Sequence, residues 1–342
     1  MTRWLRLLLL PWHALAVLTR AKGFASPVIG SPALNRLGLH VWRTRAAAAM
    51  AARRRRRLAP LVSEADRAAF ARDGFVERRD FLPTDVFAAL RRDVAALPAA
   101  SREMREGDAV TRHIALTPQV LARCPGLRAL VEHPEFRGLT RYVAGSSAEP
   151  WIAVQTVLSH AVAGDDGPQT RLHMDTFHPN IKAWFFLHEV AEADGPLTYV
   201  PGSHLPTRRR LAWQRAESIR AARRGGGGAF RIPAAQLPRL RLPPARRFAV
   251  PGNTLVVGDM FGLRARGASL RPSVRVEVYA ISRPSPFWPF ALSPTDRLLP
   301  ALRRRKFGLA WWVQDRLARA GLGPVKWRPA PRGAFDPMET SR

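Results

Sequence analysis

The chain has 342 residues, 46% of them apolar, so it can bury a core and is too hydrophobic to be a disordered polymer. Its formal charge of +29 comes almost entirely from arginine, because lysine occurs only at Lys22, Lys182, Lys306 and Lys326. The single cysteine, Cys124, excludes an intramolecular disulfide and a thiolate zinc cluster, and it favours a reducing, cytoplasmic compartment.

Two interpretations of the charge stay open. Enrichment in Arg, Ala, Pro and Gly is what a GC-rich genome imposes on any protein. Alternatively, the basic segments Arg53–Arg57, Arg208–Arg210 and Arg303–Arg305 with Lys306 form a surface for an anionic membrane, which would make the protein peripheral to it. No zinc finger, RNA-recognition signature or basic zipper is present, so nucleic acid is not an expected partner.

Residues 1–60 are expected to form a basic, helical N-terminal extension. The apolar stretch Leu7–Leu18 is too short to span a bilayer, and no small-residue cleavage site follows it. It is interpreted as an amphipathic helix that contacts a membrane or packs on the core. Ala46–Arg57 is predicted to form a second helix, whose terminal arginines complement the helix dipole.

Residues 61–145 are expected to be a helical support region. Ser63 is a candidate N-cap for a helix that Gly74 ends. A second helix is predicted from Pro83 to Leu97, where apolar residues recur at helical spacing.

The pattern changes at Trp151, after which short apolar or alternating runs are separated by turn signals. These runs cover 151–160, 169–175, 182–190, 197–200, 248–250, 254–257 and 274–282. The expected fold is therefore mainly β, a jelly roll over 146–285 with helical flanks at both ends. The segment 205–245, which contains Gly225–Gly228, is expected to be a mobile loop or insertion, and 286–342 a basic helical tail.

His173 and Asp175 are the central candidate site residues. Side chains alternate along a strand, so these two point to the same side and Met174 points to the other. An imidazole and a carboxylate at this offset can occupy adjacent positions around a metal, and a distant histidine would complete the facial triad of a non-haem Fe(II) oxygenase.

Several ordered blocks around this motif resemble the bacterial phytanoyl-CoA dioxygenase family. They are GPQTRLHMDTFHPNIKAWFFLHEV, GPLTYVPGSH and PGNTLVVGDMFGLRARG followed by SVRVEVYAISRPSPF. The resemblance implies a double-stranded β-helix (cupin-like) that binds Fe(II) and 2-oxoglutarate and hydroxylates a small molecule with O2. It also implies that His173 and Asp175 are metal ligands and catalytic residues.

The same resemblance places Arg275 where the family has the arginine that holds the far carboxylate of 2-oxoglutarate, a task that suits a planar guanidinium. An ordinary pair with Glu277 is the alternative. Gln155, Lys182 and Trp184 lie on strands that should line the barrel, and they are candidate contacts for the cosubstrate or substrate.

The distal metal ligand departs from the family pattern. Its expected position falls at Arg264, and no histidine follows His204. Arginine has no acceptor lone pair and cannot bind Fe(II), but it could pair with Asp175. Asp259 and His178 are the remaining candidate donors, besides His204.

Two functions follow from this. One is Fe(II)/2-oxoglutarate-dependent hydroxylation of an acidic or lipid-like small molecule. The other is a binding or scaffolding role with a decayed metal site, in which both cofactors are in doubt.

Overall fold

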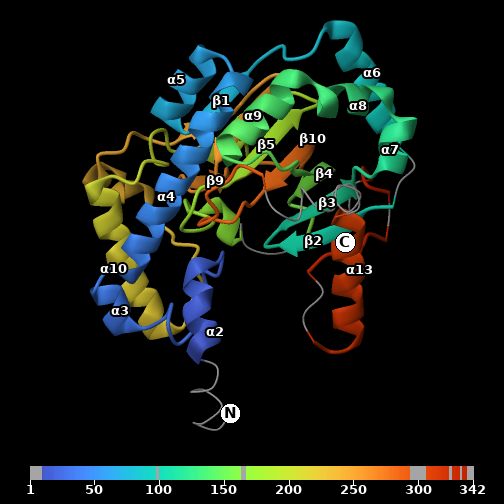
Figure 1. The fold of residues 1–342 in the computed structure, drawn as a ribbon. Coiled ribbons are helices and arrows are strands. Elements are labelled where there is room, and N and C mark those ends of the chain that lie inside the picture. The colour runs from blue at the N-terminus through green and yellow to red at the C-terminus, as the bar shows by residue number, and fades with distance from the viewer. Residues whose placement is uncertain are drawn as a thin grey trace.

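The computed structural model describes residues 10–97, 100–162, 167–292, 306–322, 326–331 and 333–336. Figure 1 shows a β-sheet core with helices packed around it. The helices are α2 (Leu10–Leu15), α3 (Pro32–Arg36), α4 (Leu39–Leu58), α5 (Glu64–Asp73), α6 (Thr84–Ala95), α7 (Pro118–Arg123), α8 (Pro125–Glu132), α9 (Pro134–Ala144), α10 (Arg208–Arg224) and α13 (Lys306–Arg319). Short 3-10 segments are η1 (Ala16–Leu18), η2 (Ala59–Leu61), η3 (Pro168–Thr170) and η4 (Ala234–Leu240).

The strands form two antiparallel sheets. They are β1 (Phe75–Arg78), β2 (Arg102–Glu106), β3 (Ala109–Ala115), β4 (Trp151–Ser159), β5 (Ile181–Phe186), β6 (Leu197–Tyr199), β7 (Arg246–Arg247), β8 (Thr254–Asp259), β9 (Arg264–Arg266), β10 (Ser273–Ser282) and β11 (Arg328–Pro329). The large sheet has the order β1-β8-β5-β10-β4-β3-β2-β11, and the small sheet has the order β7-β6-β9. Helix accounts for 41% of the structure and strand for 21%, so the fold is mixed rather than mainly β as expected.

The small sheet continues through the segment that carries His173. The His173 amide donates to the Arg264 carbonyl at 2.9 Å, and the Arg264 amide donates back to the His173 carbonyl at 3.0 Å. The predicted strand over 169–175 is therefore reduced to an isolated bridge at His173, with η3 before it.

This arrangement is a double-stranded β-helix. From β4 to β10 the chain crosses between the two sheets at every connection except the one from β6 to β7, and the sheets pack face to face. The predicted jelly-roll core is confirmed.

Strand β5 separates the two halves of the hydrophobic core. Phe185 faces the helices, where its ring centroid lies 5.9 Å from that of Phe87 on α6. Trp184 and Phe186 face the small sheet and join the cluster that contains Tyr199. This alternation follows from the two-residue period of a strand, and it confirms that both faces of the strand are buried.

Both helices predicted in the support region are present. The Ser63 hydroxyl accepts the amide of Asp66 at 3.1 Å and caps α5, and Gly74 ends that helix with a φ of 84°. α6 covers most of the range predicted for the second helix. In Figure 1, α9 lies across the outer face of the large sheet beside α5 and α8.

Two expectations about the flanks of the core need correction. The support region is not purely helical, because β1, β2 and β3 extend the large sheet. The segment 205–245 is not a loop, because it forms α10 and η4. Gln214 of α10 accepts a hydrogen bond from Thr44 of α4 at 3.3 Å, so this helix is packed on the N-terminal extension.

Arginines of the predicted basic surface are part of the interior. Arg54 is 2% exposed and Arg210 is 1% exposed, and both donate to backbone carbonyls. Arg55 forms an ion pair with Asp259 at 2.8 Å. The first two predicted basic segments therefore do not form a continuous exposed surface, and the side chains of 303–306 lie outside the described part of the chain.

The role of Phe185 in the core gives a stability prediction. Phe185→Ala should lower the free energy of unfolding by about 3–5 kcal/mol, because it leaves a cavity at a fully buried position. Phe290→Ala is the matched control, since Phe290 is 52% exposed and its loss should change stability by less than about 0.5 kcal/mol. Urea unfolding measures both variants, and equal effects would contradict this assignment of the core.

Buried histidines make the stability of the folded protein depend on pH. Burial lowers the pKa of His40 to about 3, and it lowers the pKa of His113, His178 and His204 to about 4. These histidines take up protons more readily in the unfolded chain, where the pKa is about 6.5. The free energy of unfolding therefore has its full value above pH 6.5 and decreases as the pH falls toward 4.

Each of these histidines should contribute about 1 kcal/mol of lost stability per pH unit between pH 6 and pH 5. Urea unfolding over this range measures the slope. His40→Gln should reduce that slope, because His40 contributes one of the protons and its partner Gln214 can still bond an amide. A free energy of unfolding that stays constant from pH 6.5 to pH 5 would contradict the prediction.

Candidate functional site

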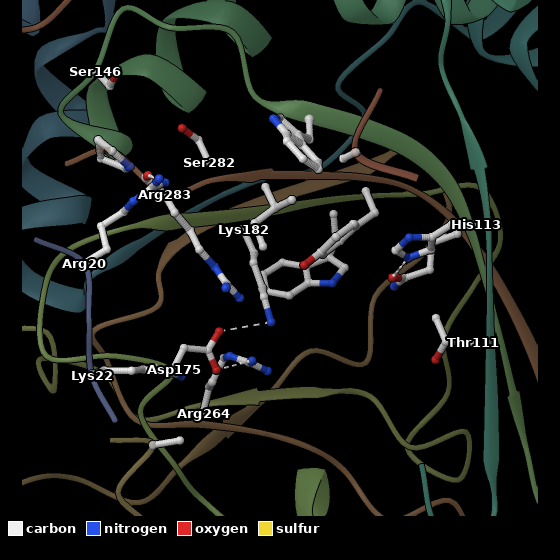
Figure 2. A pocket seen from close by; sticks show the side chains of 18 of the residues that line it. Arg20, Lys22, Thr111, His113, Ser146, Asp175, Lys182, Arg264, Ser282 and Arg283 are labelled. Atoms are coloured by element: carbon white, nitrogen blue, oxygen red, sulfur yellow. Dashed lines mark hydrogen bonds and ion pairs between the residues drawn. The ribbon is translucent and has the colours of Figure 1, made fainter. Parts of the chain in front are cut away.

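A cavity of about 1300 Å³ opens between the two sheets. Its wall brings together residues from the N-terminal segment, from β4, β5, β9 and β10, and from α13. Figure 2 shows Asp175 in this cavity with Lys182 and Arg264 pointing at its carboxylate. All of the residues predicted for the site except Glu277 and the alternative metal donors line this cavity.

Three cationic side chains meet at Asp175. Arg264 Nη2 lies 2.5 Å from Asp175 Oδ1, and Lys182 Nζ lies 3.1 Å from Oδ2. Lys22 Nζ donates to the Asp175 backbone carbonyl at 2.5 Å. The predicted pair between Arg264 and Asp175 is therefore present, and the buried carboxylate is paired with two cations while a third binds the backbone carbonyl of the same residue.

His173 completes this cluster. Its Nδ1 donates to the Arg171 carbonyl at 2.7 Å, which leaves the lone pair of Nε2 directed toward the site. His173 Nε2 lies 3.4 Å from Asp175 Oδ1, so the two side chains do lie on the same side as predicted. An imidazole lone pair and a carboxylate thus converge on one region, and the guanidinium of Arg264 is the cation bound there.

Local charge shifts the proton affinities of this cluster. Burial alone would raise the pKa of Asp175, but Arg264 and Lys182 outweigh it and hold the pKa well below its usual value. Burial, and then Arg264, lower the pKa of Lys182 to about 8 although Asp175 opposes the shift. Burial also lowers the pKa of His173. At neutral pH Asp175 is therefore ionised, and the site carries an excess of positive charge.

Lys22 is the member of the cluster that sequence reasoning missed. It comes from the N-terminal segment, 153 residues before Asp175. A signal for it was present, because lysine is so rare in this arginine-rich chain. Of the four lysines, Lys22, Lys182 and Lys326 line the cavity.

Arg275 and Gln155 belong to a second polar group. Arg275 Nε lies 3.0 Å from the buried carboxylate of Glu277, and its Nη1 donates to the Gly195 carbonyl at 2.8 Å. Gln155 donates to Glu277 and accepts from His113 Nε2 at 2.6 Å. The alternative pair of Arg275 with Glu277 is therefore present, although it is buried rather than exposed.

The remaining predicted residues are distributed as follows. Trp184 lines the cavity and is 5% exposed. Asp259 is bound to Arg55 and accepts backbone amides, and His178 Nδ1 donates to the Pro179 carbonyl at 3.0 Å. His204 packs on the ring of Phe70. None of these three alternative donors lines the cavity.

The donor set does not fit a three-ligand Fe(II) centre. Such a centre needs two histidines and a carboxylate, and only His173 and Asp175 converge here. No group of three or more His, Cys, Asp or Glu side chains is placed to hold a metal ion within the described ranges. In addition, Fe(II) would have to compete with Arg264 and Lys182 for the same carboxylate oxygens.

Comparison with known proteins finds a family model that is similar to part of the chain. Residues 70–228 match the sequence model of the phytanoyl-CoA dioxygenase (PhyH) family. This segment, slightly less than half of the chain, is similar to that family. The matched range includes His173 and Asp175 but ends before Arg264 and Arg275. No curated protein matches the chain.

Solved structures with a similar arrangement include the epimerase SnoN in complex with Fe3+, alpha ketoglutarate and nogalamycin RO. It shares 21% identity over 65% of this chain and 83% of its own, with a TM-score of 0.41. HygX from Streptomyces hygroscopicus, with nickel and 2-oxoglutarate bound, shares 14% identity over 64% of this chain and 86% of its own, with a TM-score of 0.40. AviO1 from Streptomyces viridochromogenes shares 20% identity over 66% of this chain and 98% of its own, also with a TM-score of 0.40.

The charge cluster gives a direct prediction. Asp175→Asn should lower the free energy of unfolding by about 3 kcal/mol, because it leaves the positive charges of Arg264 and Lys182 buried without a carboxylate. Glu192→Gln is the control, since Glu192 pairs with Arg247 at the surface and its loss should have no measurable effect. Urea unfolding compares the two, and an unchanged Asp175→Asn variant would mean that the cations do not depend on Asp175.

Proposed function

We propose that the cavity binds a small organic carboxylate by ion pairing, and that the guanidinium of Arg264 replaces the metal ion at the His173–Asp175 pair. The observation that supports this most directly is the excess of cations over carboxylates around Asp175. In this proposal Arg264 stands at the position of the family's third ligand. The protein is then a binding member of the PhyH family rather than an oxygenase.

The charge of the whole cavity supports the same ligand class. Among the described lining residues, ten are Lys or Arg and three are Asp or Glu. Buried Arg264 Nε has no hydrogen-bond partner among the described residues, so it can donate to a ligand. A carboxylate ligand would accept from Arg264 and Lys182 and would reduce the excess positive charge.

A second candidate function is the family's Fe(II)/2-oxoglutarate-dependent hydroxylation. The specific observation in its favour is the orientation of His173, whose Nε2 lone pair lies beside Asp175 at 3.4 Å. Arg275 would then hold the far carboxylate of 2-oxoglutarate after partial release from Glu277, with Trp184 beside it. The substrate of such a reaction stays unidentified, and an acidic or lipid-like molecule suits the basic wall.

Isothermal titration with succinate and 2-oxoglutarate in the presence of a chelator tests the proposal. Both acids should bind without metal, and the neutral analogue succinamide should not. Lys182→Gln and Arg264→Gln should each weaken binding at least about tenfold, because each removes a charge-assisted hydrogen bond. Arg247→Gln, which changes an arginine paired with Glu192 at the surface, is the control and should bind like the unmodified protein.

An anaerobic titration with Fe(II) and 2-oxoglutarate separates the two candidates. The proposal predicts no visible charge-transfer band for the natural chain and a band for Arg264→His, in which a third donor replaces the guanidinium. Stoichiometric Fe(II) binding by the natural chain, lost in His173→Ala, would overturn the proposal in favour of the hydroxylase.

A further inference from the structure

The described N-terminal and C-terminal segments both display apolar side chains that nothing in the described structure covers. In the N-terminal segment, Trp12 is 70% exposed, Leu15 is 58% exposed and Leu18 is 53% exposed. On α13, Trp312 is 53% exposed and Leu309 is 43% exposed. Large side chains of this kind are normally exposed singly, so two groups of them indicate a surface with a partner.

The exposed residues of α13 form one stripe of the helix. Leu309, Trp312, Val313 and Leu317 follow the spacing of a single helical face and are each at least 40% exposed. The other face is held on the protein, because Asp315 pairs with Arg102 at 2.5 Å and Trp311 lies against Arg102. The stripe is therefore an outward face of a docked helix.

The N-terminal group is also held in place. Arg43 is 1% exposed, and its guanidinium donates to the carbonyls of Val17, Thr19 and Ala21. This fixes the chain just after α2, so the exposed residues of α2 and η1 have a defined position. In Figure 1, α2 and α13 extend on the same side of the β-sheet core.

The charge of these two segments selects the partner. Residues 10–22 and 306–331 contain a single carboxylate, Asp315, which is paired with Arg102. Their exposed basic residues, among those that the structure describes, are Arg20, Arg316, Arg319, Lys326 and Arg328. Arg316 lies 5.0 Å from the ring of Trp312, which is the combination of an aromatic ring and a cation found at membrane interfaces.

We infer that the apolar faces of α2–η1 and α13 together form a docking surface for an anionic lipid bilayer. No helix within the described residues is long and apolar enough to cross a membrane, so the contact is interfacial. Both segments also contribute to the wall of the cavity, through Leu18 and Arg20 on one side and Trp311 and Gln314 on the other. The docked protein would therefore have the cavity next to the bilayer. This surface does not depend on which ligand the cavity binds.

Co-sedimentation of the full chain with sucrose-loaded vesicles tests this inference. The protein should bind vesicles of phosphatidylcholine and phosphatidylglycerol, bind phosphatidylcholine alone much more weakly, and be released by added salt. The double variant Leu309→Glu, Trp312→Glu should bind the anionic vesicles at least about tenfold more weakly.

Leu205→Glu is the matched control, because Leu205 is 42% exposed and lies on the loop that Gly202 fixes to α5, away from both segments. It should bind like the unmodified protein, and thermal unfolding by circular dichroism should be the same for all three proteins. The inference is overturned if the natural chain stays unbound with anionic vesicles, or if the double variant binds as well as the natural chain. It is also overturned if these substitutions dissociate a dimer in light scattering while vesicle binding is absent, since the occupant would then be a second copy.

Discussion

The arrangement of side chains in the cavity depends on the neutralisation of the Asp175 carboxylate. An ionised carboxylate inside a protein is costly unless cations and hydrogen bonds surround it. Here Lys182 on one sheet and Arg264 on the other pair with the carboxylate, and Lys22, before the barrel, binds the backbone carbonyl of the same residue. The electrostatic requirement of one side chain therefore connects the N-terminal segment to both sheets.

The large positive charge of the chain has a partly structural explanation. Arg43, Arg54 and Arg210 are nearly fully buried, and their guanidinium groups donate to backbone carbonyls in neighbouring segments. A planar group with five donors can satisfy several carbonyls that have no other partner, which lysine cannot do as well. These arginines thus connect segments of the fold, and the exposed arginines are available for anionic partners.

The sequence was informative wherever local periodicity determines structure. The alternation at Trp184, Phe185 and Phe186 follows from the strand period, and the end of α5 follows from Gly74. His173 and Asp175 lie on the same side as predicted, although only His173 forms a β-bridge there. The family resemblance indicated the position of the barrel, and the family model matches residues 70–228.

The contacts that periodicity could not supply are long-range. No local sequence pattern relates Lys22 to Asp175, because the two residues are 153 positions apart. Gly225–Gly228 favoured the prediction of a mobile loop, although the helix α10 ends directly before these glycines. The support region also supplied strands, because short runs such as β2 and β3 become strands only when a neighbouring strand offers an edge. The scarcity of lysine in the sequence is the compositional signal that could have indicated Lys22 as a site residue.

The backbone bridge between His173 and Arg264 has a consequence for which substitutions the barrel tolerates. Its two hydrogen bonds join main-chain atoms, so they do not depend on which side chain position 264 carries. The barrel can therefore keep its backbone geometry while the side chain at position 264 changes, so the charge inside the cavity can vary without a change of fold.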